Sequence, residues 1–165
     1  MMKVVVGYPN EREEFVIVER MTGTLLPVGK VITTDQLIEL QGEADKVYVD
    51  PALMEFAVKV VTATRKAKEY GVADVAPYIQ YGASPRASIN LILTARALAF
   101  VRGRNYVLPQ DILDMALDVM RHRLVLSFEA LSDNISSDDL LKTILERIPM
   151  PVVPLREHVN ARVSA

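Results

Sequence analysis

The segment 81–86, Tyr-Gly-Ala-Ser-Pro-Arg, has the residue types of an anion site at a helix start. Ser84 followed by Pro85 predicts a first helical turn, where backbone N–H groups are unpaired and the helix dipole is positive. Arg86 adds a guanidinium to that turn, which is unfavourable for a cation unless an anion shares the place. A helix start and a guanidinium can together hold a phosphate. On the residues alone, Arg86 could instead face water or pair with a carboxylate such as Asp74.

The sequence does not match the pattern of a complete nucleotide-binding site. Phosphate-binding loops follow the pattern G-x-x-x-x-G-K-[ST], and the nearest approach here runs from Gly23 to Lys30. Gly23 and Gly29 are separated by one residue too many. Pro27 interrupts the segment, and Val31 stands where a hydroxyl should bind magnesium. Since there is also no apolar strand ending in an Asp-Glu pair, we predict that the chain alone does not hydrolyse ATP.

Composition narrows the classes of protein further. A length of 165 residues, half of them hydrophobic and 24% charged, fits one globular domain or a small domain plus a piece of another. The absence of cysteine and the presence of only two histidines argue against disulfides, a zinc site or a His-based triad. A net charge of −2 gives no electrostatic reason to expect a nucleic-acid partner. The apolar runs are short and no signal peptide is evident, so we predict no membrane insertion and a cytoplasmic location.

The chain begins with a strand-like segment and a helix. Residues 3–6, Lys-Val-Val-Val, predict a short buried strand that ends at the turn 7–9. A lone strand cannot pair its backbone, so its sheet should lie elsewhere. Asn10 predicts the start of a helix with an acidic first turn, which Gly23 ends.

The remaining elements are mostly helical. The predicted helices run from Thr34 to about Leu40 before Gly42, from Asp50-Pro51 to Gly71, from Ser84-Pro85 to about Arg102, onward from Pro109, and onward from a cap at Ser136 or Ser137. For the third of these, the spacing predicts an inward face of Ile89, Ile92, Leu93, Ala97, Phe100 and Val101. The fold class is therefore mainly α: a small helical bundle preceded by a strand and a helix.

Several motifs occur in the order typical of one family. The segment 82–87, Gly-Ala-Ser-Pro-Arg-Ala, resembles the sensor 2 motif of MoxR-type AAA+ ATPases. Flanking segments resemble the same family, namely Gly7-Tyr8-Pro9 with Glu13-Glu14, Val49-Asp50, Ala63-Thr64-Arg65, 95–99, 103–107, Pro109-Gln110-Asp111, 118–124 and 148–151. The resemblance extends from residue 3 to about residue 154. Each motif is short, but their order and spacing together are specific.

The resemblance implies a domain organisation. Residues 1–30 would be the end of the α/β ATPase core, with its last strand and the following helix. Residues 31–150 would form the AAA+ helical lid, and residues 151–165 a proline-containing tail. An N-terminal core with the phosphate loop, the magnesium-binding Asp-Glu pair and the first sensor is expected to precede Met1.

The resemblance also implies roles for site residues. Arg86 would be the sensor 2 arginine that reaches the γ-phosphate from the lid, with Ser84 and Pro85 beside it. Tyr8 and Pro9 match the hinge between core and lid and would lie near the base. ATP with magnesium is expected in the full-length parent, and no cofactor is expected for this chain alone.

The implied function is that of a lid fragment in a chaperone-like ring ATPase. Its partners would be the N-terminal core, the neighbouring subunits of a hexameric ring and proteins with von Willebrand factor A-type domains. One alternative is a stand-alone helical protein-interaction module without nucleotide binding. Another is a DNA-binding helical domain, against which the charge balance argues.

Other residues have simpler interpretations. The basic cluster 121–123, Arg-His-Arg, is predicted to complement a helix C-terminus, with a contact to a neighbouring subunit as the alternative. Arg96, Arg102 and Arg104 are predicted to be a solvated face. Leu108 replaces the Thr or Ser cap common in such lids, which predicts a helix start weaker by about 1 kcal/mol.

Overall fold

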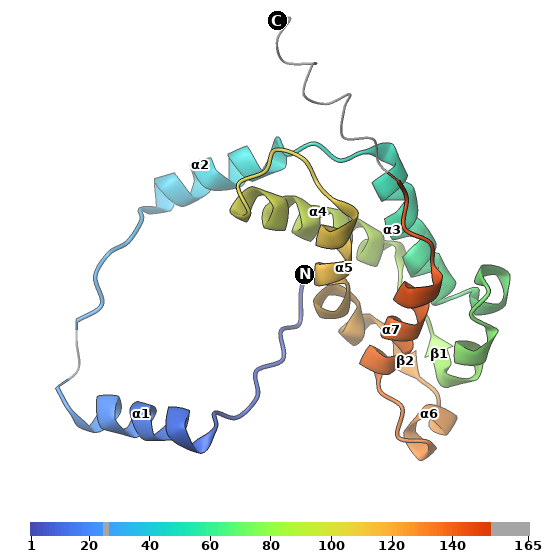
Figure 1. Ribbon diagram of the computed structural model, residues 1–165, viewed down its shortest axis with the longest axis horizontal. Helices are drawn as coiled ribbons and strands as arrows, with labels where there is room; N and C mark the ends of the chain where they lie inside the picture. The colour runs from blue at the N-terminus through green and yellow to red at the C-terminus, as the bar shows by residue number, and fades with distance from the viewer. Residues whose placement is uncertain (25–26, 153–165) are drawn as a thin grey trace, which may run out of the picture.

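The structure, a computed structural model, describes residues 1–24 and 27–152 of the chain (Figure 1). The elements, in chain order, are α1 (Glu11–Thr22), α2 (Thr34–Asp45), α3 (Pro51–Ala63), η1 (Ala67–Tyr70), η2 (Ala73–Tyr78), β1 (Ile79–Tyr81), α4 (Pro85–Val101), α5 (Pro109–Met120), η3 (Arg121–Arg123), β2 (Val125–Leu126), α6 (Phe128–Ser132) and α7 (Ser137–Arg147). β1 and β2 pair antiparallel in a two-stranded sheet. The predicted fold class, a mainly α bundle, is confirmed.

The core lies among four helices. α4 packs against α3 and α5, and α7 covers α5 (Figure 1). The largest fully buried side chains include Leu53, Phe56, Leu91, Ile112, Met120, Leu141 and Ile144. Burying such side chains contributes about 1.5–3 kcal/mol each, so the bundle has a substantial apolar core.

Local signals set the helix starts. The Asp50 side chain accepts the Ala52 N–H at 2.8 Å, and Pro51 occupies the first helical position of α3. At α7, Ser136 accepts the Asp139 N–H at 3.2 Å, while the Asp139 carboxylate accepts the Ser136 N–H at 3.0 Å. These interactions involve residues at most three apart, so they could be predicted from the sequence.

Two helix ends differ from the prediction. α2 begins after a Thr33 cap and continues through Gly42 to Asp45, because one glycine in an exposed helix costs only about 1 kcal/mol. α3 ends at Ala63 rather than near Gly71. Gly71, with φ 74°, instead ends η1. The chain leaves α3 early because Thr64 makes a tertiary hydrogen bond, described below.

The segment before α1, residues 1–10, which we call the leader, also differs from the prediction. Residues 3–6 do not form the predicted strand, because no strand partner lies within residues 1–24 and 27–152. Instead the Lys3 N–H donates to the Asp118 carbonyl at 2.7 Å. The predicted helix α1 forms, but it stands apart from the bundle and all its residues are exposed (Figure 1).

The buried face of α4 was predicted incorrectly. Ile89 and Val101, expected to point inward, are 59% and 80% exposed, and Leu93 and Ala97 are exposed as well. The buried residues are Ala87, Leu91, Thr94, Ala95 and Ala99, while Ile92 and Phe100 are partly buried. Small side chains on the inner face allow α3 and α5 to approach α4 closely. The larger aliphatic residues therefore form an exposed stripe.

Candidate functional site

The start of α4 is open to solvent. Ser84 holds the cap position with extended backbone (φ −76°, ψ 167°), but its side chain makes no capping hydrogen bond. Pro85 follows at the first helical position, and the first turn holds no acidic residue. Ser84, Pro85 and Arg86 are all exposed. The positive end of the helix dipole is thus not neutralised by a nearby side chain.

Arg86 is a free cation at this helix start. Within residues 1–24 and 27–152 it has no hydrogen-bond or ion-pair partner. The possible partner Asp74 is occupied, because Arg147 binds its carboxylate with two hydrogen bonds, one of them 2.9 Å from Nη2 to Oδ2. The hydrogen bonds from Arg147 hold the pKa of Asp74 below its usual value. The pairing of Arg86 with Asp74 is therefore ruled out in this structure.

The segment before Arg86 is attached to the end of α3. The buried Ala83 N–H donates to Thr64 Oγ1 at 2.9 Å, and the Thr64 hydroxyl donates to the Val61 carbonyl at 2.7 Å. A Cβ on Gly82 would lie 2.4 Å from the Thr64 carbonyl oxygen. Segments 63–65 and 82–86 thus meet in space, although about twenty residues separate them. The sequence analysis quoted Thr64 within a motif but assigned it no role.

Tyr8 and Pro9 are not brought to this site. Both are exposed residues of the leader, which Figure 1 shows apart from the start of α4. Their role beside a base stays a prediction.

Comparisons with known proteins bear on the family of this chain. A family model described as the AAA lid domain matches residues 72–144, which include α4 and α5. The chaperone MoxR1 of Mycobacterium tuberculosis is 43% identical over 153 residues, which are 93% of this chain and 41% of that protein. The chain belongs to the MoxR-type AAA+ family and carries its lid domain.

Two more matches extend over most of this chain. The uncharacterised protein YeaC of Bacillus subtilis is 30% identical over 154 residues, 92% of this chain and 45% of that protein. A crystal structure of a protein described as a candidate ATPase, from Cytophaga hutchinsonii, superposes with a TM-score of 0.87 at 36% identity. It covers 92% of this chain and 47% of that chain. The MoxR-type lid chain thus spans less than half the length of the relatives it matches.

At the far end of α4, this MoxR lid contains a buried carboxylate that the sequence analysis missed. Asp111 is 0% exposed and accepts hydrogen bonds from Arg104 at 2.6 and 2.7 Å, from Arg102 at 2.9 Å and from the Leu108 N–H at 2.8 Å. We call these four residues the Asp111 cluster. Burial alone would raise the pKa of Asp111, but the hydrogen bonds from Arg104, Leu108 and Arg102 outweigh it and lower the pKa.

The Asp111 cluster corrects two predictions. Arg102 and Arg104 are not a solvated face but bind a buried carboxylate. The helix start at Leu108, which has no capping side chain, is also stabilised, because the Asp111 carboxylate at the third helical position accepts the Leu108 N–H. The signal was present in the sequence, because an Asp three residues after a helix start is one half of a capping box.

The basic cluster 121–123 is likewise structural in part. Arg121 Nε donates to Asp138 of α7 at 3.0 Å, and its Nη1 donates to Asp118 at 2.6 Å and to the Lys3 carbonyl at 3.0 Å. Arg121 therefore joins the end of α5 to α7 and the leader, rather than only complementing a helix C-terminus.

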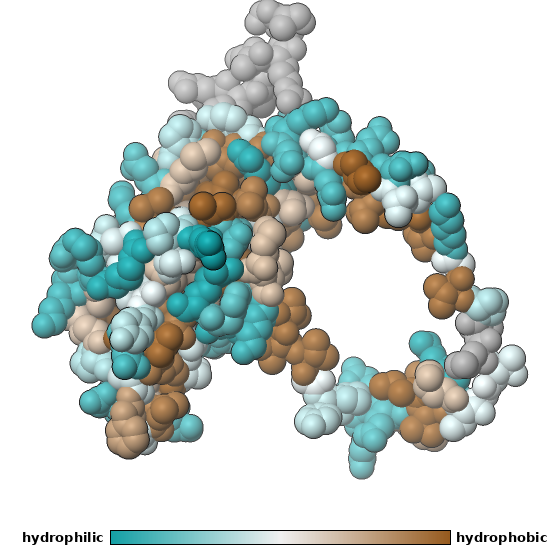
Figure 2. All heavy atoms as spheres, turned by 180° about the vertical axis from the view of Figure 1, so that it is seen from behind, coloured by the Kyte–Doolittle hydropathy of each residue, from teal (hydrophilic) through white to brown (hydrophobic). Residues whose placement is uncertain are grey.

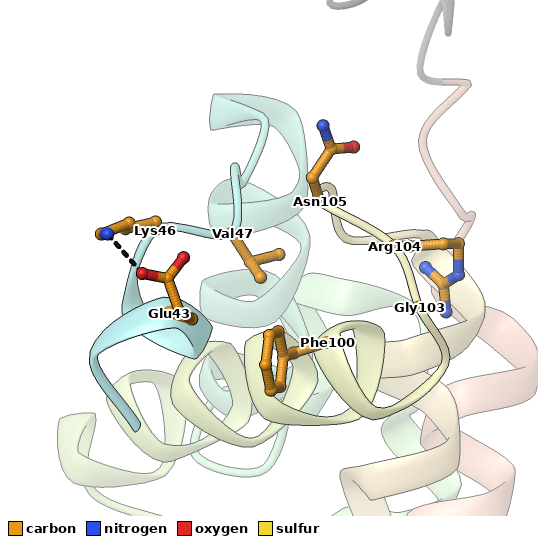
Figure 3. A pocket seen from close by; sticks show the side chains of 7 residues that line it. All are labelled: Glu43, Lys46, Val47, Phe100, Gly103, Arg104 and Asn105. Atoms are coloured by element: carbon orange, nitrogen blue, oxygen red, sulfur yellow. Dashed lines mark hydrogen bonds and ion pairs between the residues drawn. The ribbon is translucent and has the colours of Figure 1, made fainter. Parts of the chain in front are cut away.

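A cavity of about 560 Å³ opens between the end of α2 and the loop after α4 (Figure 3). Its lining residues are Glu43, Lys46, Val47, Phe100, Gly103, Arg104 and Asn105. Lys46 forms an ion pair with Glu43 at 2.5 Å, on the rim of the cavity. α4 has 17 residues and is therefore roughly 25 Å long, so this cavity lies far from Arg86. None of the predicted site residues lines it.

In the described part of the chain, no helix is both long and apolar enough to cross a bilayer.

Proposed function

We propose that this chain works as the lid of a MoxR-type AAA+ ATPase and that Arg86 is its sensor 2 arginine. One observation supports this role above the others: Arg86 is an exposed cation, unpaired among the described residues, at an open helix start without acidic neighbours in its first turn. Such a group can stabilise charge on the γ-phosphate during phosphoryl transfer. It can also couple the angle of the lid to the state of the nucleotide.

The residues of the site fit one phosphate rather than a whole nucleotide. A guanidinium and the positive end of a 17-residue helix favour a phosphate oxygen. The sequence has no phosphate loop and no Asp-Glu pair, so an N-terminal core would hold ATP and its magnesium. Ser84 and Pro85 would then border the phosphate, and Tyr8 and Pro9 would lie at the hinge beside the base.

The exposed apolar surface supports an assembly larger than this chain. Figure 2 shows apolar side chains along the leader and α1, and α1 exposes Phe15, Val18 and Met21. We propose that residues 1–30 complete an ATPase core, that residues 31–150 form the lid, and that the parent assembles as a hexameric ring. The predicted tail, residues 151–165, lies largely outside the described residues. The relative named as a chaperone supports a remodelling function, with von Willebrand factor A-type proteins as proposed partners.

The test is ATP turnover in the full-length ATPase that carries this lid. Arg86→Ala should lower kcat roughly 100-fold, since removing one donor that stabilises a transition-state charge typically costs 100- to 1,000-fold. Arg86→Lys should recover part of the loss, because it keeps the charge but not the planar fork. Lys59→Ala, which removes an exposed cation of α3, is the matched control. Unchanged ATP turnover in Arg86→Ala would contradict the assignment of Arg86 as the sensor 2 arginine.

A second function follows from the exposed stripe of α4. Ile89, Leu93 and Val101 could bind another protein in a stand-alone interaction module. This alternative predicts a monodisperse chain without nucleotide affinity. The coding sequence upstream of residue 1 separates the two: an open frame with a phosphate loop supports the lid, and a stop codon without one supports the module.

A further inference from the structure

The segment before Arg86 forms a junction between the end of α3 and the residues that follow β1. Thr64 is 3% exposed and follows α3, and Ala83 is fully buried between β1 and α4. The Thr64 hydroxyl accepts the Ala83 N–H and donates to the Val61 carbonyl. Only a group that both donates and accepts can make this pair of bonds, and a hydroxyl is the smallest side-chain group that does so.

Gly82 brings the two segments closer than any other residue could. A Cβ at this position would lie 2.4 Å from the Thr64 carbonyl oxygen and 2.7 Å from Arg65 Cγ. Real Cβ atoms do not approach a backbone oxygen so closely. The Thr64–Ala83 hydrogen bond and this close contact therefore hold the backbone at two consecutive residues.

The first turn of α4 is otherwise held by its own backbone, with the Ala87 N–H donating to the Ser84 carbonyl at 2.8 Å, and not by side-chain hydrogen bonds. The Ser84 side chain forms no cap, and Arg86 itself has no partner among residues 1–24 and 27–152. The Ala83 N–H is three residues from Arg86, and Ala87 is buried on the following side. A displacement of about 1 Å in a positioned group can cost about 100-fold in rate. The position of the guanidinium is thus sensitive to the hydrogen bond at Ala83.

We propose that Thr64 is a positioning residue for Arg86, acting through its hydroxyl bond to Ala83 and the close contact at Gly82. This inference rests on the proposed function of Arg86. Thr64 would not touch the nucleotide. It would set the direction in which α4 starts, and with it the place that Arg86 reaches on the phosphate.

The experiment measures ATP turnover in the full-length ATPase. Thr64→Val keeps the shape of the side chain and removes the hydroxyl, so kcat should fall roughly 10-fold while the KM for ATP changes little. Thr64→Ser keeps the hydroxyl and should retain most of the activity. Thr62→Val is the matched control, because the Thr62 hydroxyl accepts only a 3.3 Å bond from Arg65.

The decisive measurement repeats Thr64→Val in an Arg86→Ala background under single-turnover conditions. If Thr64 acts through Arg86, the second substitution should add no further loss. The same 10-fold loss in both backgrounds would show a purely structural role and overturn the inference. Full activity of Thr64→Val would overturn it as well.

The outcomes separate the two proposals. A silent Arg86→Ala removes the proposed function, whereas an impaired Arg86→Ala with a silent Thr64→Val removes only the role of Thr64. Circular dichroism and thermal unfolding establish that each variant is folded at the assay temperature. If Thr64→Val does not fold, Thr64→Cys takes its place, since a thiol is a weaker donor and acceptor. An intermediate loss is then expected, and full activity contradicts the inference.

Discussion

At the C-terminal end of α4, Arg102 and Arg104 bind the fully buried Asp111, and each guanidinium has defined partners. At the N-terminal end of the same helix, Arg86 is exposed, has no partner in the part of the chain that the structure describes, and lies at the dipole end that repels it. The helix dipole favours the cations Arg102 and Arg104 at the C-terminal end and opposes the cation Arg86 at the N-terminal end. An arginine that stabilises the fold has its counter-charge within the chain, whereas an arginine without a counter-charge there is a candidate for binding an anion outside it.

The largest expected effect is the loss of the buried charge. Asp111→Ala would remove the buried carboxylate that Arg102 and Arg104 bind, so their positive charges would lose this counter-charge. The free energy of unfolding should fall by about 3–5 kcal/mol. Urea unfolding of the lid followed by circular dichroism measures this. Asp114→Ala removes the outer carboxylate, which binds Arg102 at 2.6 Å near the surface, and should cost less than about 1 kcal/mol. Equal losses in the two variants would contradict the comparison.

A steric change at the start of α4 should have the next largest effect. Gly82→Ala forces the backbone away from Thr64 and should cost about 1–3 kcal/mol of unfolding free energy. Gly42→Ala is the control, because nothing lies within 4 Å of a Cβ there and alanine favours the helix by about 0.5–1 kcal/mol. Thermal unfolding should therefore shift in opposite directions for the two variants. A neutral Gly82→Ala would show that the junction is looser than the contact indicates.

Acid should weaken the Asp111 cluster in a defined direction. The pKa of Asp111 is lowered in the folded state, so the unfolded chain binds more protons there when the pH falls below about 3.9. Its contribution to stability is complete above that pH and is lost as the pH drops through the folded-state value. Urea titrations of the unsubstituted chain and of Asp111→Asn between pH 7 and pH 3 measure the difference between their free energies of unfolding. The difference should shrink in acid, and a constant or growing gap would be evidence against the charged cluster.

The smallest expected effect is that of Arg86 on stability. Arg86→Ala removes no hydrogen bond or ion pair within the described residues, so the free energy of unfolding should change by no more than about 0.5 kcal/mol. Arg104→Ala, at the other end of α4, should cost several times more. Parallel urea titrations of the two variants test the contrast directly. A large loss for Arg86→Ala would mean that the arginine has a structural role after all.

Helix starts could be predicted because their causes are local. Asp50-Pro51 and the Ser136–Asp139 pair act within three residues, and α3 and α7 begin where these signals place them. Helix ends were less predictable. Gly42 did not stop α2, and α3 stopped at Ala63 because Thr64 turns to meet Ala83, nineteen residues further along the chain.

The candidate site shows the same division. The serine, proline and arginine of segment 84–86 could be assigned to a helix start from their types and order alone. Whether Arg86 is paired could not be predicted from the sequence, because Asp74 was a possible partner. In the structure, Arg147 binds Asp74 instead. The capping bond of Asp111 to Leu108 could be predicted, but its pairing with Arg102 and Arg104 could not, because that pairing depends on how the chain folds between α4 and α5.

The sequence by itself determined the mainly α class, the starts of α1, α3, α4, α5 and α7, the family and the position of Arg86 in a first turn, because these depend on neighbouring residues and their order. Tertiary structure decided which face of α4 is buried, since the alanine side allows closer packing than the isoleucine and valine side. It also decided which charges are paired and that Thr64 holds Ala83. Those outcomes depend on contacts between segments distant in sequence, and no periodicity encodes them.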